Sequence, residues 1–240
     1  MFQQCDQLKK QLDALRPLSQ HTAKSLHEQL VLEWTYNSNA IEGNTLTLKE
    51  TKVVLEGITI GGKPMREHFE AINHKEAIDY VEDIVHKQEA LSERVIRSIH
   101  QLVLKNIDDA HAGRYRLENV VIAGAEHTPP DYIHISQHMS DLLTWYHNCT
   151  AHPIERAARL HTDFVKIHPF VDGNGRTARL LMNLDLMSCG YLPVVIKASE
   201  RLRYYEALDQ AHTTQDYDDF LTLVSGVEAH VLHHYLKLLS

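Results

Sequence analysis

The sequence predicts an all-α fold, a compact bundle of helices from which one small β-hairpin projects. Glycine supplies 10 and proline 7 of the 240 residues, and both shares lie below the usual values of about 7% and 5%. A chain with few helix breakers forms long regular elements. Neither an internal repeat nor a Ser/Gly-rich linker divides the chain. We therefore expect one helical domain over residues 1–240.

The N-terminal helices have clear start and stop signals. An amphipathic segment over 3–16 ends at Pro17, and Ser19 can cap a second helix that runs to about Trp34.

A capping box marks the next helix, because Thr47 and Glu50 have the required spacing, and we expect this helix to end near Gly57. The remaining helices are predicted from apolar periodicity and capping residues. One of them begins after Ser92. The others cover 66–87, 136–147, 153–166, 174–189, 200–211 and 217–238.

One stretch, 118–134, has β-strand character. Its first part, NVVIAG, is rich in β-branched residues, and EHTPPDYI is rich in turn formers. This pattern is typical of a small hairpin.

Composition excludes several classes of protein. The formal charge of −8 makes general binding to nucleic acid unfavourable. The three cysteines form no CxxC pair, so neither a disulfide framework nor a zinc ribbon is indicated. The N-terminus lacks an apolar signal core, and the longest apolar run, Tyr191–Ile196, is far below the ~18 residues that a membrane helix needs. We expect a cytoplasmic protein with no membrane partner.

The segment HPFVDGNGRTAR, residues 168–179, interrupts the helical pattern. Its two glycines, Gly173 and Gly175, permit close approach of a ligand. The N–H groups at the start of the following helix favour an anion there. Arg176 and Arg179 share a face of that helix start, where cations oppose the helix dipole. The pattern predicts that an anion binds between them.

Two further side chains complete a catalytic set. Asp172, a carboxylate beside phosphate-binding groups, indicates a divalent cation, and Mg²⁺ commonly uses one or two carboxylates together with substrate phosphates. His168 is the natural proton acceptor near neutral pH. These groups suit the attack of a hydroxyl on a phosphate of a nucleotide.

At every position this segment resembles the signature of the Fic family. The resemblance implies a helical fold and protein AMPylation, the transfer of AMP from ATP to a Ser, Thr or Tyr hydroxyl of a target protein. ATP would be the co-substrate and Mg²⁺ the cofactor. His168 would deprotonate the target and Asp172 would bind the metal. The anion hole and the clamps of the β- and γ-phosphates would be Gly173, Asn174, Gly175, Arg176 and Arg179.

The family also has a β-hairpin flap that aligns the backbone of the target. By resemblance, this target-binding flap would comprise Val120, Val121, Ile122 and Ala123, inside the predicted hairpin.

The stretch RLRYYEALDQAH, 201–212, resembles the segment of Fic proteins that closes over the nucleoside. Tyr204 and Tyr205 fit that segment. His212 stands where many relatives carry an Asn.

Upstream, SNAIEGN over 38–44 places Ser38 and Glu42 on one helical face, with Gly43 suited to end that helix. This resembles the inhibitory motif of Fic proteins. By that resemblance Glu42 would pair with Arg179 in cis and keep ATP from aligning. The N-terminal helices over 1–65 would thus carry the inhibitory segment, followed by a Fic core over 66–215 and a C-terminal helix over 216–240.

Other readings of the same residues stay open. The site could remove AMP, with Glu42 positioning a water, or transfer another nucleotide or phospho group. GNG followed by Arg is more typical of AMP transfer than of the phosphate-transferring branch, which has Lys in place of the second Gly. The chain could instead be a non-catalytic helical interaction module. The 18 histidines suggest a metal, but no HExxH motif supports one. A homodimer that holds the inhibitory segment is consistent with the resemblance.

Overall fold

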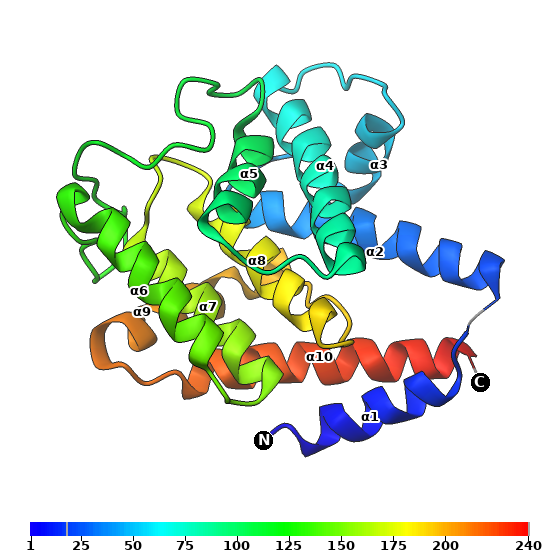
Figure 1. Cartoon of the computed structure of the whole chain (residues 1–240). Coiled ribbons are helices and arrows are strands. Elements are labelled where there is room, and N and C mark those ends of the chain that lie inside the picture. The colour runs from blue at the N-terminus through cyan, green and yellow to red at the C-terminus, as the bar shows by residue number, and fades with distance from the viewer. Residues whose placement is uncertain (18, 240) are drawn as a thin grey trace.

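The computed structural model describes residues 1–17 and 19–239, and its elements are helices joined by loops (Figure 1). Apart from the end of α2, each predicted α-helix bound lies within three residues of the observed one; for α5 only the start was predicted. The elements are α1 (Gln3–Ala14), α2 (Gln20–Ile41), α3 (Leu48–Leu55), α4 (Met65–Lys87), α5 (Glu93–Leu104), η1 (Tyr132–His134), α6 (Ile135–Asn148), α7 (Pro153–Ile167), α8 (Asn174–Ser188), η2 (Ala198–Glu200), α9 (Arg201–Thr214) and α10 (Asp218–Leu239).

The predicted helix caps are confirmed. Ser19 and Ser92 each accept a hydrogen bond from a backbone N–H in the first turn of their helix, at 3.2 Å and 3.3 Å. At α3, Thr47 accepts from the Glu50 N–H at 3.2 Å, while the Glu50 carboxylate accepts from the Thr47 N–H at 2.7 Å. These bonds satisfy N–H groups that have no partner inside the helix.

The predicted end of α2 near Trp34 is wrong, because the helix continues to Ile41. The added turns contain polar residues such as Ser38 and Asn39, which look like solvent-exposed positions but are buried. Asn39 donates to the Thr35 carbonyl at 3.0 Å and to the Glu70 carbonyl of α4 at 3.2 Å. Contacts to other helices therefore hold this segment in place. The predicted inhibitory segment, 38–44, lies at the C-terminal end of α2 and in the turn that follows it.

Helix α8 lies at the centre of the molecule, with α7, α4, α5 and α2 packed around it (Figure 1). Almost all of its side chains are buried, as expected for a helix covered on every side. One apolar core takes buried side chains from every α-helix except α3. A smaller cluster of Leu46, Val54 and Ala71 joins α3 to α4. The predicted division at residues 65 and 215 stays a prediction.

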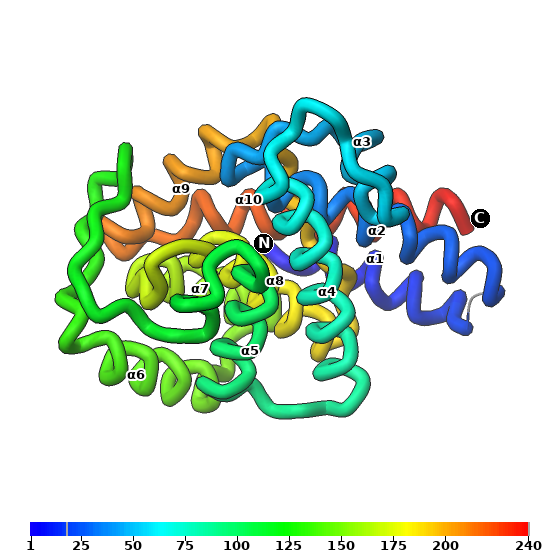
Figure 2. The backbone as a smooth tube through the Cα atoms, turned by 90° about the horizontal axis from the view of Figure 1, so that it is seen from above, coloured from blue at the N-terminus to red at the C-terminus, as the bar shows by residue number. Residues whose placement is uncertain are grey.

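The predicted β-hairpin is wrong, because the described residues contain no strand. Residues 118–131 instead form a loop that stands out on one side of the bundle (Figure 2). Val121 is 89% exposed, whereas Val120 and Ile122 are half-buried. An isolated two-stranded hairpin is marginally stable in water. The residues predicted to form the flap, all located in this loop, are Val120, Val121, Ile122 and Ala123.

None of the helices in residues 1–17 and 19–239 combines the length and the apolar character needed to cross a bilayer.

Candidate active site

The predicted catalytic loop joins α7 to α8 and is held closed by its own side chains. It starts at His168, which has a left-handed φ of 50°, and ends at Gly173, the N-cap of α8. The Asn174 amide accepts from the Phe170 N–H at 3.0 Å and donates to the Phe170 carbonyl at 2.8 Å. Phe170 is fully buried and anchors the loop in the core. The Asn174 side chain is thus occupied by the loop, which leaves its backbone to face a ligand.

His168 is half-buried beside the buried Arg116. Arg116 donates from Nε to the His168 carbonyl at 2.9 Å, and its backbone N–H donates to the Pro169 carbonyl at 2.9 Å. Burial lowers the pKa of His168 to about 4, and the charge of Arg116 acts in the same direction. The imidazole is therefore neutral at pH 7, the state in which it can accept a proton.

Arg116 also ties the exposed loop to this site. Its Nη1 donates to the Glu118 carbonyl at 2.8 Å, and its Nη2 donates to the Pro130 carbonyl at 2.6 Å. Both ends of the loop are thereby fixed to the residue that holds His168. The loop starts and ends beside the site, as a target-binding segment would need to.

The Asp172 carboxylate is 43% exposed and already has three hydrogen-bond donors. Oδ1 accepts from the Gly173 N–H at 2.6 Å and from Arg176 Nη2 at 3.3 Å, and Oδ2 accepts from Arg66 Nη2 at 2.5 Å. Burial alone would raise the pKa of Asp172, but Arg176, the Gly173 N–H and Arg66 together hold it below its ordinary value. Asp172 is therefore ionised and available to a cation that displaces Arg66.

His100 on α5 supports the same loop from behind. It stacks on Phe170 with ring centres 3.5 Å apart, and its Nε2 donates to the Asp172 carbonyl at 2.8 Å. Nδ1 accepts from the Gly113 N–H at 2.9 Å, which places the proton on Nε2. Gly173 has a φ of +76° and lies so close that a Cβ there would come 3.4 Å from His100 Nε2. Both the backbone conformation and the packing therefore favour glycine at this position.

Arg176 is buried, with its side chain 3% exposed, and some of its N–H groups donate no hydrogen bond within the described chain. Nη1 lies 3.5 Å from Glu70 Oε1, and Nη2 donates to Asp172. Within the described chain, Nε and Nη1 donate no hydrogen bond. Buried donors without acceptors are costly, and phosphate oxygens would satisfy them.

Arg179, also 3% exposed, is fully engaged by its neighbours. Nε donates to Ser38 Oγ at 3.0 Å, and Nη2 donates to the Ser38 carbonyl at 2.8 Å. Nη2 also donates to Glu42 Oε1 at 2.7 Å, and Nη1 donates to the Tyr204 hydroxyl at 3.2 Å. Burial would lower the pKa of Arg179, but Tyr204 and Glu42 raise it above its ordinary value. The structure thus places Glu42 on the second arginine of the signature.

Glu42 is the first residue after α2, and Gly43, with a φ of +98°, turns the chain away. Gly175 is the second residue of α8 and faces the Glu42 carboxylate. The predicted inhibitory residues and the start of α8 therefore meet, although they lie far apart in the sequence.

The three residues predicted near the nucleoside all have protein partners. Tyr204 is buried, and its hydroxyl lies 3.0 Å from His161 Nε2 as well as accepting from Arg179. The Tyr205 hydroxyl donates to the Ile41 carbonyl at 3.1 Å. His212 is buried, with Nε2 2.9 Å from the Thr162 carbonyl. Tyr205 thus connects α9 to the end of α2, and Tyr204 connects α9 to Arg179 on α8 and His161 on α7.

The residues present suit a magnesium ion that is shared with phosphates. Among residues 1–17 and 19–239, no group of three or more His, Cys, Asp or Glu side chains is placed to hold a metal by itself. Mg²⁺ needs few protein ligands when phosphates complete its octahedron. Asp172, ionised and partly exposed at the start of α8, is such a ligand, and the unpartnered donors of Arg176 fit the accompanying phosphates.

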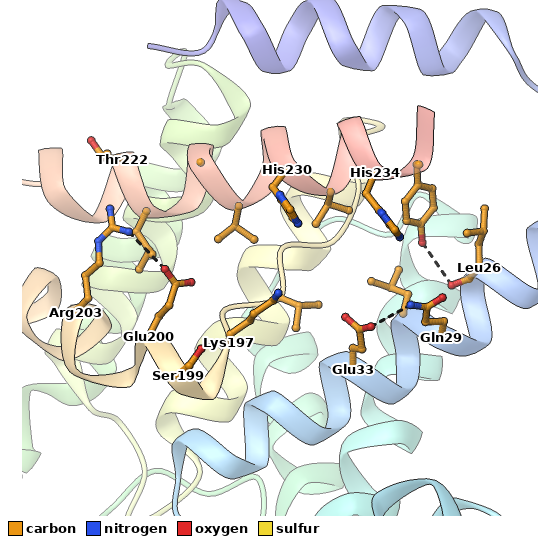
Figure 3. A pocket seen from close by; sticks show the side chains of 17 residues that line it. Leu26, Gln29, Glu33, Lys197, Ser199, Glu200, Arg203, Thr222, His230 and His234 are labelled. Carbon is orange, nitrogen blue, oxygen red and sulfur yellow. Dashed lines mark hydrogen bonds and ion pairs between the residues drawn. The ribbon is translucent and has the colours of Figure 1, made fainter. Parts of the chain in front are cut away.

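A cavity of about 770 Å³ lies elsewhere, between α2, α10 and the segment 195–203 (Figure 3). None of the predicted site residues lines it. Several of its polar groups are paired with one another, as Gln29 is with Glu33 and Arg203 with Glu200. The chemistry of the signature loop is therefore separate from this cavity.

The sequence analysis missed four residues that shape the site, namely Arg66, Glu70, His100 and Arg116. Each lies outside the signature and reaches it only through tertiary packing. No local pattern in the sequence marks them.

Comparison with known proteins agrees with this geometry. The model of the Fic/DOC family matches residues 90–186. A Fic-domain-containing signaling protein of Bacteroides thetaiotaomicron has a solved structure that superimposes with a TM-score of 0.90, at 30% identity over 98% of this chain and 96% of that chain. This chain belongs to the Fic/DOC family. Fic-1 (aa134 - 508) of Caenorhabditis elegans superimposes with a TM-score of 0.86 at 33% identity, over 98% of this chain and 71% of that one.

Among curated proteins, this Fic chain is 40% identical to the protein adenylyltransferase Fic of Nematostella vectensis, over 84% of its own length. It is 34% identical to the protein adenylyltransferase Fic of Aedes aegypti over 98% of its length. The chain spans about half of each of these relatives, 48% and 47%.

Proposed function

We propose that this chain is a protein adenylyltransferase that transfers AMP from ATP to a Ser, Thr or Tyr hydroxyl of a target protein. One observation supports this most strongly. The first turns of α8 hold two buried arginines, Arg176 and Arg179, at the helix end that is already positive. Such an arrangement is stable only with anions beside it, and carboxylates now fill that role. A triphosphate would replace those carboxylates.

The reaction needs a base and a stabilised leaving group. The target hydroxyl oxygen attacks the α-phosphorus of ATP, and its proton passes to the neutral imidazole of His168. The new O–P bond forms as the bond to the β-phosphate oxygen breaks, so that pyrophosphate leaves. Arg176, Arg179 and the N–H groups at the start of α8 stabilise the phosphate charge. Mg²⁺, when bound, neutralises further phosphate charge, and Asp172 is the residue that would hold it.

Glu42 acts as a brake on this reaction. Glu42 Oε1 accepts a hydrogen bond from Arg179 Nη2 at 2.7 Å. Arg179 is then not available to the end of the triphosphate, which keeps only Arg176. Misplacement of a substrate by about 1 Å costs about 10²-fold in rate. Release of Glu42 therefore turns a slow enzyme into a fast one.

The test uses α-labelled ATP and Mg²⁺ with the unmodified chain, Glu42→Gly, and Glu42→Gly combined with His168→Ala. We expect protein-bound label to rise about 10²-fold in Glu42→Gly and to fall about 10²- to 10⁴-fold when His168 is also changed. A lysate supplies targets, and mass spectrometry identifies the modified side chains.

Thermal denaturation with MgATP is the companion measurement. Binding stabilises a protein by about 2.7 kcal/mol at a ligand concentration of 100 Kd. If folded Glu42→Gly gave neither label nor thermal shift, the chain would be a non-catalytic interaction module.

A further inference from the structure

Gly175 stands at a position where the backbone does not require glycine. It is the second residue of α8 and has ordinary helical geometry, unlike Gly173, whose φ is +76°. Glycine inside a helix is less stable than alanine, because it loses more conformational freedom on folding. Some other constraint must therefore favour the absence of a side chain at this position.

Besides the close approach of a ligand, one such constraint is the carboxylate of Glu42. A Cβ added at Gly175 would lie 2.4 Å from Glu42 Oε1 and 3.3 Å from its Cδ, and 3.2 Å from Arg179 Nη1. The first distance is well below van der Waals contact, so one of the groups would have to move. The carboxylate therefore occupies the space that a methyl group at position 175 would fill.

Of the two neighbours, Glu42 is the one free to leave. Arg179 is 3% exposed and is held by Ser38 and by Tyr204 as well as by Glu42. Glu42 is 34% exposed, and within residues 1–17 and 19–239 its carboxylate accepts a hydrogen bond only from Arg179. A side chain at 175 would therefore push the carboxylate toward solvent and leave the arginine in place.

We propose that Gly175 is the residue that permits the inhibited state: its missing side chain makes room for Glu42 on Arg179. Any side chain at this position expels the carboxylate and releases the brake. This inference rests on the proposed function, because it concerns the regulation of the same site. It gives the second glycine of the signature a role in inhibition that is separate from contact with phosphates.

The experiment is a double-mutant cycle in thermal denaturation, without nucleotide, so that any effect on phosphate binding is absent. The four proteins are the unmodified chain, Gly175→Ala, Glu42→Ala and the double variant. With Glu42 truncated, Gly175→Ala should leave the Tm unchanged or raise it by at most about 2–4 °C, because alanine is the better helix former but its Cβ still lies 3.2 Å from Arg179 Nη1. In the unmodified chain the same substitution should lower the Tm, because it breaks the contact with Arg179.

Gly226 provides the matched control. It is also a glycine inside a helix, in α10, and a Cβ there would meet nothing within 4 Å. Gly226→Ala should shift the Tm equally in both backgrounds. If Gly175→Ala also gave equal shifts in both, the steric role of Gly175 would be refuted.

Failure of this inference can be told apart from failure of the proposed function. AMP labelling of Glu42→Gly tests the brake itself. If that label rises while the cycle shows no coupling, only the role of Gly175 falls. If the label does not rise, the proposed brake falls regardless of how the cycle turns out.

Discussion

Two carboxylate–arginine contacts flank the start of α8, one at Arg179 and one at Asp172. They differ in burial. At the Arg179 end, the guanidinium is 3% exposed and donates four hydrogen bonds. At the Asp172 end, the pair with Arg66 is open to water, with side chains 43% and 55% exposed. The contact at Arg179 is therefore held by buried groups, whereas the contact at Asp172 can exchange with water or a cation.

Burial decides the difference in energy. Loss of an acceptor leaves the buried Arg179 charge less well paired; because Glu42 is itself 34% exposed, the cost stays below the value of about 3–5 kcal/mol for a fully buried pair. Exposed ion pairs are worth about 0.2–1 kcal/mol, because water competes for both partners. We therefore expect control of the proposed AMP transfer to reside at the Arg179 end, and only adjustment of metal binding at the Asp172 end.

The carboxylates at both contacts, Glu42 and Asp172, act on the pKa of His168. The pH dependence of AMP transfer is therefore expected to show the largest effect. Burial lowers the pKa of His168 to about 4, while the carboxylates of Glu42 and Asp172 act in the opposite direction. In Glu42→Gly one of these carboxylates is gone, so the pKa falls further and the base stays neutral in mild acid. We expect kcat/KM for AMP transfer at pH 5 to stay within about twofold of its value at pH 7. A histidine with the usual pKa near 6.5 would lose about 30-fold over that range.

Circular dichroism at pH 5 serves as the control for folding. It is needed because burial also lowers the pKa of His100 and of His212 to about 4. Between the unfolded pKa of about 6.5 and this value, the unfolded chain binds more protons than the folded one, so stability falls as the pH falls. A decline of the rate centred near pH 6.5 in folded protein would contradict the neutral-base assignment.

The second effect concerns the hydrogen bonds that hold Arg179. Ser38→Ala removes the Oγ that accepts from Arg179 Nε at 3.0 Å and leaves a buried donor unpaired. We expect a loss of about 1–3 kcal/mol in the free energy of unfolding, measured by urea denaturation. Ser188→Ala is the matched control, because the hydroxyl of Ser188 bonds within its own helix to the Leu184 carbonyl. Equal losses in the two variants would show that the Arg179 end is no tighter than an ordinary helix surface.

The smallest effect belongs to the exposed end. Arg66 donates to Asp172 Oδ2 at 2.5 Å, so a metal ion at that oxygen must displace it. In the Glu42→Gly background, Arg66→Ala should lower the Mg²⁺ concentration for half-maximal nucleotide binding by about 2- to 5-fold. Arg94→Ala, which removes an exposed arginine paired with Glu89, should leave it unchanged. A higher Mg²⁺ requirement in Arg66→Ala would mean that Arg66 assists metal binding.

What the sequence could predict follows the range of the interactions. The caps, most helix bounds and the position of the loop between α7 and α8 depend on residues close together in the chain, and these predictions are confirmed in the structure, whereas the roles of the loop residues stay predictions. Pairing of Glu42 with Arg179 was expected only by resemblance, because the two residues lie 137 apart. Arg116 and Arg66 were missed, since their contacts arise only when separate helices pack.

Two sequence predictions failed for related reasons. The end of α2 was misplaced because its polar last turns are stabilised by α4 and α8, which no local pattern records. The hairpin was predicted from β-branched residues in 118–134, but a strand also needs a partner and a surface to pack on. In the folded chain that segment protrudes, and Arg116 holds its ends instead.

The identity of the transferred group tests the central claim most directly. Folded Glu42→Gly is incubated with Mg²⁺ and ATP labelled at either the α- or the γ-phosphate, and protein-bound label is counted. The proposed chemistry predicts that the α-label stays on protein and that the γ-label leaves with pyrophosphate. Protein labelled from the γ-phosphate, or from neither position, would contradict it.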